Sequence, residues 1–200
     1  MIASTAAIFL VGGKSSRMEQ PKALLEFDGE PLIVHLVRRL EPHFPERIVV
    51  AAEGQMLPEL DAQVVVDEIP DQGPLGGLYS GLRAAAAEVA FVTACDVPFL
   101  SVELAALLVG RLGAASAVVP RFDGRLQPLH AAYRCAVADV FRRRLATGER
   151  RTIEAAATLD PVVVDEEELR AFDPEGLSFR NLNFPEDYAA ALTLWPRRRP

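Results

Sequence analysis

Cysteine is scarce in this sequence of 200 residues, which contains only Cys95 and Cys135. Two isolated cysteines give neither the ligand spacing of a structural zinc site nor the framework of a disulfide-stapled domain. Cys95 directly follows an apolar run, so we expect it to pack as a small apolar side chain. His130 and Cys135 have no evident triad partner in the sequence. We therefore expect no nucleophilic catalysis by a thiol or a histidine.

An excess of positive charge and long apolar runs are also missing. The formal net charge is −7, which argues against general nucleic-acid binding as the main activity. The first residues lack the basic stretch of a signal peptide, and the first apolar run breaks at Gly12, too early for a membrane span. We therefore expect a cytoplasmic protein with neither a nucleic-acid nor a membrane partner.

The overall composition is that of an ordinary globular protein. Hydrophobic residues make up 50% of the chain and charged residues 24%, enough apolar material for one sizeable core. We expect a single domain over residues 1–196. The remaining residues, 197–200, form a basic tail that is most simply a frayed end.

The positive charge that the sequence does carry gathers in residues 10–25. An apolar run leads directly into Gly12 and Gly13, and paired glycines after a buried strand let the backbone approach a ligand closely. Three cations and two hydroxyls follow within a short reach, and together they favour a polyanion such as a triphosphate; they are Lys14, Ser15, Ser16, Arg17 and Lys22.

This stretch is neither of the two best-known phosphate loops. A Walker A loop requires a glycine where the chain has Ile8. The dinucleotide fingerprint fails as well, because the two glycines are adjacent and two serines follow. An ordinary basic surface loop is the remaining structural alternative.

Apolar runs and turns alternate four times in the first 120 residues. We expect strands at 6–11, 47–52, 64–66, 89–94 and 117–120, with 162–164 and 180–182 completing the sheet and a helix after 185. This order predicts an α/β fold, a doubly wound and mostly parallel Rossmann-like sheet. Two short extended pieces around Asp123 and Gly124 predict a small β-hairpin insertion.

Four helices are expected between these strands, and the last of them covers about 137–145. The first covers 31–40, with an apolar stripe from which His35 and His43 deviate, so we expect both histidines to be solvated. Residues 71–77 are rich in glycine and proline and are expected to form a rigid turn, followed by a small-residue helix from Leu78 to Ala87. Ser101 is a suitable N-cap for the third helix, which runs to Leu112.

Four residues lie at the carboxyl ends of predicted strands, the edge where parallel sheets bind their ligands. They are Gly12, Glu53, Asp67 and Asp96. Asp96 is the best candidate for a metal ligand, because Mg²⁺ takes one or two protein carboxylates and completes its shell with phosphate oxygens and water. The structural alternative for Asp96 is an Asx turn that caps the next helix.

The order of short motifs along nearly the whole chain resembles the molybdenum cofactor guanylyltransferases, which are similar to other nucleotide-sugar and cytidylyl transferases. The matching motifs are Leu10-Val11-Gly12-Gly13, Arg17-Met18, Lys22-Ala23-Leu24-Leu25, Gly73-Pro74-Leu75-x-Gly77, Cys95-Asp96-x-Pro98, Pro128-Leu129 with Tyr133, and Asn181-x-Asn183-x-Pro185-Glu186-Asp187. The resemblance implies a nucleotidyltransferase fold and the transfer of GMP from GTP to molybdopterin, with release of pyrophosphate.

The resemblance also implies roles for individual residues. Lys22 and Arg17 would contact phosphates, Asp96 would ligate Mg²⁺, and these three form the implied catalytic set. Asn181 and Asn183, with the segment from Gln127, would face molybdopterin. The residues implied to bind the nucleotide are Leu10, Val11, Gly12, Gly13, Lys22, Asp67 and Asp96. Implied partners are other proteins of molybdenum cofactor biosynthesis and the molybdoenzymes that receive the cofactor.

The sequence departs from the family pattern at a few positions. Val11 replaces the usual alanine, Glu19 a glycine, Phe184 a threonine and Glu53 an asparagine. The change at Glu53 leaves open the choice between guanine and cytosine. The alternatives are therefore a cytidylyl or sugar-nucleotide transferase on the same scaffold and a non-catalytic nucleotide-binding regulator.

Overall fold

A computed structural model describes residues 4–12 and 20–195 of the chain. The strands within these residues are β1 (Thr5–Leu10), β2 (Glu26–Phe27), β3 (Glu30–Pro31), β4 (Glu46–Ala51), β5 (Gln63–Val66), β6 (Val89–Ala94), β7 (Ala117–Phe122), β8 (Arg125–Leu126), β9 (His130–Arg134) and β10 (Val162–Val164). The α-helices are α1 (Leu32–Leu40), α2 (Pro74–Ala84), α3 (Val102–Gly110), α4 (Ala138–Ala146), α5 (Thr152–Ala157), α6 (Glu166–Leu169) and α7 (Pro185–Leu194), and short 3₁₀ turns cover Lys22–Leu24, Cys135–Val137 and Leu177–Phe179.

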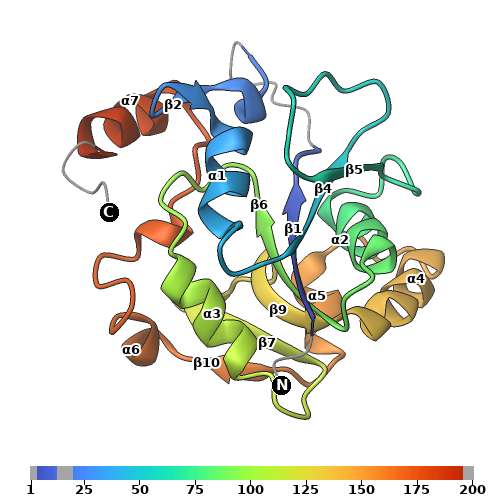
Figure 1. Cartoon of the computed structure of the whole chain (residues 1–200). Helices are drawn as coiled ribbons and strands as arrows, with labels where there is room; N and C mark the ends of the chain where they lie inside the picture. The colour runs from blue at the N-terminus through green and yellow to red at the C-terminus, as the bar shows by residue number, and fades with distance from the viewer. Residues whose placement is uncertain (1–3, 13–19, 196–200) are drawn as a thin grey trace.

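The main sheet has the order β10-β7-β9-β6-β1-β4-β5, with β8 paired to β7 (Figure 1). The strands β6, β1, β4 and β5 pair in parallel, as do β10 and β7. Strand β9 lies between β6 and β7 and is antiparallel to both. The predicted doubly wound, mostly parallel sheet is therefore confirmed, with one antiparallel strand inserted.

The predicted β-hairpin joins β7 to β8. Its two turn residues, Asp123 and Gly124, have φ angles of 49° and 69°, the left-handed pair that a two-residue hairpin requires. A second hairpin of the same kind, turning at Asp28 and Gly29, joins β2 to β3.

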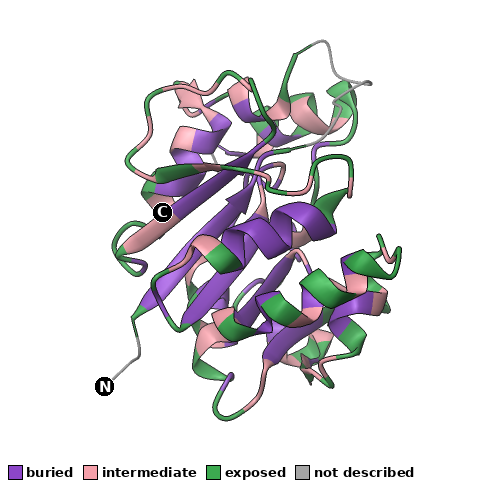
Figure 2. Cartoon of the chain, turned by 90° about the vertical axis from the view of Figure 1, so that its right-hand side faces the viewer, coloured by how far each residue is buried: buried purple, intermediate pink, exposed green. Residues whose placement is uncertain are grey.

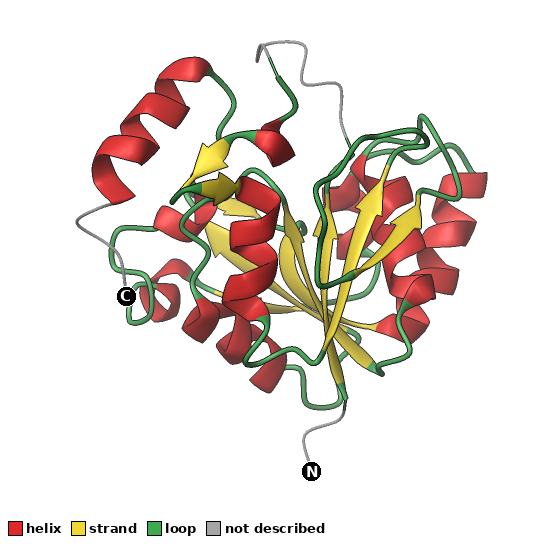
Figure 3. Cartoon of the chain, turned by 45° about the horizontal axis from the view of Figure 1, so that its top comes forward, coloured by secondary structure: helices red, strands yellow, loops and turns green. Residues whose placement is uncertain are grey.

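Helices cover both faces of the sheet (Figures 2 and 3). The sheet separates two apolar layers, because alternate side chains of each strand point to opposite faces. Ala7 and Phe9 of β1 face the layer formed by α1 and α3, whereas Ile8 and Leu10 face α2 and α4. All four are buried. Within residues 4–12 and 20–195, no helix combines the length and the apolar character that crossing a membrane requires.

Helix α2 begins earlier than the sequence predicted. It covers Pro74–Ala84, so the expected turn at 71–77 is wrong in its last four residues and the predicted end at Ala87 is three residues too late. A proline at the first helical position loses no hydrogen bond and brings a helical φ angle, and Gly73 just before it has a φ of 63°. The helix therefore starts at the proline.

Two further expectations were wrong. His35 is buried, with 1% exposure, because Phe27 and Trp195 pack edge-on against its ring at 5.1 and 4.9 Å. Burial, and then the charge of Arg39, lowers the pKa of His35 to about 4. Residues 180–182 form a loop and not a strand, because the Leu182 amide bonds the Asp96 carbonyl (2.8 Å) and is not paired in the sheet.

Gly81 lets α2 lie directly on the sheet. A Cβ at this position would lie 2.5 Å from Ile8 Cγ2 and 3.0 Å from Val50 Cγ2, and both side chains are buried. We expect Gly81→Ala to lower the free energy of unfolding by about 1–3 kcal/mol, because the added methyl group overpacks the core. Urea denaturation followed by circular dichroism measures this loss.

Gly110→Ala is the matched control for Gly81→Ala. Gly110 is exposed at the end of α3, and a Cβ there would meet no described atom within 4 Å. This alanine is expected to stabilise the protein slightly, since it reduces the entropy of the unfolded chain. Equal stability of the two variants would contradict the close contact of α2 with the sheet.

Candidate active site

Asp96 is the second residue after β6. The arrows of β1 and β6 end at the same edge of the sheet (Figure 1). The backbone of this turn is fixed on two sides. The Cys95 amide donates to the Leu10 carbonyl (3.1 Å), and the Leu182 amide donates to the Asp96 carbonyl (2.8 Å). The Asp96 side chain is largely buried, with 15% exposure, so its carboxylate is held in one place at the strand end.

Lys22 joins three segments that are far apart in the sequence. Its Nζ atom lies 2.9 Å from Asp96 Oδ2 and 3.1 Å from Asn183 Oδ1. Lys22 begins the 3₁₀ turn Lys22–Leu24, whose Ala23 is anchored in the core. Asn183 lies two residues before the start of α7, and its amide donates to Asp187 Oδ2 (2.9 Å) in the first turn of that helix. The structure therefore brings together one residue each from the predicted phosphate, metal and acceptor groups.

The second oxygen of Asp96 fits a metal ion. Asp96 Oδ1 is buried and has no hydrogen-bond partner among the described residues. No three side chains of His, Cys, Asp or Glu gather at one point in residues 4–12 and 20–195. A single carboxylate suits Mg²⁺, which completes its shell with substrate phosphates and water. The residues present thus fit a magnesium ion that is bound jointly by the protein and the nucleotide.

The segment from Leu10 to Gly12 passes over the carboxyl edge of the sheet beside β4. The Val11 amide donates to the Val50 carbonyl (2.9 Å), and Gln55 Nε2 donates to the Val11 carbonyl (3.2 Å). Gly12 is exposed, and the nearest described atom to a Cβ built on it would be 4.0 Å away. The described residues leave room for a side chain at position 12, so their packing does not account for the glycine. Close approach of a ligand to the backbone accounts for it better.

Asp67 lies three strands away from Asp96, at the end of β5. Its Oδ1 atom accepts hydrogen bonds from Ser80 Oγ (2.9 Å) and the Ile69 amide (3.1 Å). Glu53, after β4, is exposed. The strand-end residues therefore line the edge of the sheet, but Asp67 does not join the group formed by Lys22, Asp96 and Asn183.

A cavity of about 170 Å³ adjoins the end of β6. Gln127 and Asn181, both from the predicted acceptor segments, lie on its wall together with the apolar side chains of Val97, Leu129 and Phe179. Asn181 thus faces this cavity, whereas Asn183 contacts Lys22. The two asparagines share one loop and serve different parts of the site.

The thiols and His130 are unsuited to proton transfer. Burial, and then the neighbouring Asp96 carboxylate, raises the pKa of Cys95 to about 12. Burial likewise raises the pKa of Cys135 to about 12 and lowers that of His130 to about 3. Near neutral pH the cysteines stay protonated and the histidine stays uncharged, in line with the expectation that none of them acts as a nucleophile.

Sequence reasoning missed two residues that shape this edge. Gln55 links the segments that follow β4 and β1, since its Oε1 accepts from the Ala52 amide (3.1 Å) and its Nε2 donates to the Val11 carbonyl (3.2 Å). Ser80 reaches Asp67 from the middle of α2. The contacts of Gln55 with Val11 and of Ser80 with Asp67 join segments that are distant in the sequence, and no motif marks either one. The proximity of Gln55 to a strand end was the one available signal. Gly13 and Arg17 lie outside the described residues.

Comparison with known proteins agrees with this arrangement. The model of the MobA-like NTP transferase domain family matches residues 7–162. A relative from Chloroflexus aggregans, named probable molybdenum cofactor guanylyltransferase, is 36% identical over 188 residues, 91% of this chain and 90% of the relative. One of the same name from Carboxydothermus hydrogenoformans is 34% identical over 96% of each chain.

A solved structure shares the fold over nearly the full length. The crystal structure of molybdopterin-guanine dinucleotide biosynthesis protein A from Archaeoglobus fulgidus superposes with a TM-score of 0.82 and 26% identity, over 96% of this chain and 99% of that one. Taken with the identities above, this likeness shows that the chain belongs to the molybdenum cofactor guanylyltransferases, within the MobA-like family of nucleotidyltransferases.

Proposed function

We propose that this chain transfers GMP from GTP to molybdopterin, with or without bound molybdenum, and releases pyrophosphate. The observation that carries the proposal is the position of Lys22 Nζ, between Asp96 Oδ2 and Asn183 Oδ1 at the carboxyl edge of the sheet. One cation there contacts both the residue expected to act on the nucleotide and the loop expected to face the acceptor. The relatives that the chain matches carry the name of this activity.

Charge neutralisation is the main task of the residues on the donor side. The triphosphate carries several negative charges, and more charge develops on pyrophosphate as it leaves. Lys22 supplies a compact cation there, and Arg17, on its family motif alone, a second one. Asp96 would hold Mg²⁺ through Oδ1, and the bound ion would neutralise charge on phosphate oxygens.

The acceptor needs alignment more than activation. A phosphate monoester is already an anion near neutral pH, so its attack on the α-phosphorus requires no general base. This agrees with the uncharged state of Cys95 and His130 near neutral pH. We place the acceptor against the cavity that contains Gln127 and Asn181 on its wall. Asn183, through Lys22, would then bring the acceptor loop into contact with the donor phosphates.

Two alternatives remain distinguishable from this proposal. A cytidylyl or sugar-nucleotide transferase would use the same edge of the sheet, because fold alone does not fix the substrate. A non-catalytic nucleotide-binding regulator would need to bind GTP but not to release pyrophosphate. The contact between Lys22 and Asp96 speaks against the regulator, since binding alone would tolerate the loss of either group.

Base preference is the decisive test of the proposal. Guanine offers two adjacent donors on its Watson–Crick edge, which a carboxylate can accept together. We expect the wild-type protein to prefer GTP over CTP when both compete for pyrophosphate release in the presence of Mg²⁺ and molybdopterin. A wild-type preference for CTP would overturn the guanylyl assignment in favour of the cytidylyl alternative.

The two candidate carboxylates are not equivalent in this test. Asp67 Oδ1 already accepts two hydrogen bonds, whereas Glu53 is exposed at the end of β4. We therefore expect Glu53→Gln to reduce the preference for GTP over CTP by about 1–3 kcal/mol, or about 5- to 150-fold. Asp67→Asn should reduce this preference less. Glu59→Gln, at another exposed position of the loop between β4 and β5, should leave the preference unchanged.

A further inference from the structure

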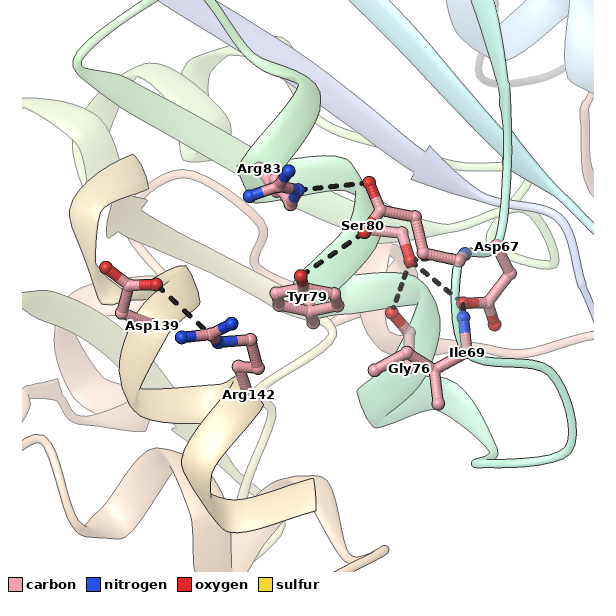
Figure 4. A network of polar contacts seen from close by, with 9 residues as sticks. Asp67, Ile69, Gly76, Tyr79, Ser80, Arg83, Asp139 and Arg142 are labelled. Atoms are coloured by element: carbon pink, nitrogen blue, oxygen red, sulfur yellow. Dashed lines mark hydrogen bonds and ion pairs between the residues drawn. The ribbon is translucent and has the colours of Figure 1, made fainter. Parts of the chain in front are cut away.

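The Ser80 hydroxyl lies at the centre of a hydrogen-bond network between α2 and the end of β5 (Figure 4). Ser80 is buried, with 2% exposure. Its Oγ atom accepts from the Glu68 amide (3.0 Å) and lies 2.9 Å from Asp67 Oδ1 and 3.0 Å from the Gly76 carbonyl. A hydroxyl has one hydrogen to donate, and a charged acceptor forms the stronger bond. Ser80 therefore donates to Asp67.

Asp67 is fixed by two further contacts. Its amide donates to the Ala51 carbonyl (2.9 Å), which extends the pairing of β5 with β4 by one residue. Its Oδ1 atom also accepts from the Ile69 amide (3.1 Å), as in an Asx turn. Figure 4 shows the second oxygen, Oδ2, pointing away from these donors. Within the described part of the chain, Oδ2 accepts no hydrogen bond.

Gly76 limits the movement of this carboxylate on the side of the helix. A Cβ on Gly76 would lie 3.1 Å from Asp67 Oδ2 and 2.9 Å from the Ile69 carbonyl. The first turn of α2 thus packs closely against the turn that follows β5. Because Oδ1 is bound and the helix blocks one side, Asp67 can offer only Oδ2 to a ligand.

The outer part of the network involves a different carboxylate. Tyr79 Oη and Arg83 Nε contact the two carboxylate oxygens of Glu68, at 3.2 and 3.1 Å. Arg83 and Glu68 are both exposed. These contacts hold Glu68 against α2 but do not touch the Asp67 side chain, so the two halves of the network can be tested separately.

We propose that Ser80 is a positioning residue for nucleotide binding: it holds Asp67 Oδ1 so that Oδ2 faces the nucleotide as a single acceptor. The inference rests on the proposed function only in assigning Asp67 to the nucleotide site. A single charged acceptor on a rigid support suits a hydroxyl or amine donor of the nucleoside. Without the Ser80 hydroxyl, Asp67 can rotate and loses part of this preorganisation.

The prediction for Ser80→Ala is a selective loss of nucleotide affinity. We expect the KM for GTP to rise about 5- to 20-fold while kcat changes less than about twofold, because binding and not the chemical step loses preorganisation. Tyr79→Phe is the matched control in the same helix; it removes the contact with Glu68 and should leave both constants unchanged. A rise in KM as large for Tyr79→Phe would show that general loosening of α2 is responsible.

A double-mutant cycle separates positioning from a structural role. If Ser80 acts through Asp67, adding Ser80→Ala to Asp67→Ala should cause no further change in GTP affinity, measured by calorimetry without acceptor. Additive losses would overturn the proposal. Calorimetry on Ser80→Thr, which keeps the hydroxyl, should show affinity closer to wild type than Ser80→Ala. Failure of the proposed function appears separately, as preference of the wild type for another nucleotide, and the cycle is then run with that nucleotide.

Discussion

Asp96→Asn is expected to reduce pyrophosphate release by about 10²–10³-fold, a loss typical of removing one group that stabilises charge in the transition state. The substitution preserves the shape of the side chain but removes the negative charge of the Asp96 carboxylate. The Oδ1 atom of this carboxylate is buried without a hydrogen-bond partner among the described residues and fits a magnesium ion. Release of pyrophosphate from GTP and molybdopterin, measured over a range of Mg²⁺ concentrations, gives the result. The half-maximal Mg²⁺ concentration should rise as well.

The fold of the Asp96→Asn variant should remain intact. The ion pair with Lys22 is largely buried, with 18% and 15% exposure of the two side chains. Asparagine keeps the shape of aspartate, and its side-chain oxygen can still accept a hydrogen bond from Lys22 Nζ. Asp61→Asn is the matched control: Asp61 pairs with Arg47 at 2.7 Å but lies just before β5, at the opposite edge of the sheet. It should retain full activity. Unchanged activity of Asp96→Asn itself would remove Asp96 from the mechanism.

Lys22→Ala has the second-largest expected effect, a joint loss of GTP affinity and turnover. Removing the ammonium group takes away a phosphate contact and leaves Asp96 Oδ2 and Asn183 Oδ1 without their shared donor. We expect turnover to fall about 100-fold. Affinity for GTP should fall about 10- to 150-fold, since a hydrogen bond to a charged group contributes about 1.5–3 kcal/mol. Calorimetric titration with GTP measures the affinity, and pyrophosphate release measures the turnover.

Lys14 is the natural comparison for Lys22, because the chain contains only these two lysines. Lys14 follows the paired glycines in the sequence but is not part of the family motif. Lys14→Ala should therefore reduce GTP affinity and turnover less than Lys22→Ala does. Arg17→Ala should resemble Lys22→Ala. If Lys14→Ala loses more GTP affinity than Lys22→Ala, the assignment of the phosphate contacts is wrong.

The position of the candidate site at the carboxyl edge of the sheet was predictable, because a charged residue or a glycine follows each strand that ends there. Asp96 and Asp67 were found in this way, since buried parallel strands place their carboxyl ends at one edge. Their partners were not predictable. The contact of Lys22 with Asn183 spans 161 residues, and that of Ser80 with Asp67 depends on how α2 lies on β5. No local pattern reports either one.

His35 shows why burial is harder to infer than secondary structure. The apolar stripe correctly predicted α1, but it could not reveal that Trp195, after α7, covers the neighbouring face of the helix. The prediction of where α2 starts was wrong for a different reason. Glycines at 73, 76 and 77 suggested a turn, whereas two of them lie inside the helix: Gly76 packs against Asp67 and Ile69 after β5, and Gly77 packs against Leu10 and Val50.

The contact between Lys22 and Asn183 also limits when, during synthesis of the chain, the proposed catalytic arrangement can form. The two residues are 161 positions apart in the sequence, so their contact cannot form before the segment around Asn183 has been synthesised. On the ribosome, the N-terminal strands emerge and can pair well before the segment around Asn183 is synthesised. A nascent chain with most of its sheet in place therefore still lacks the arrangement that we propose for catalysis, and turnover begins only after the segment around Asn183 has been synthesised.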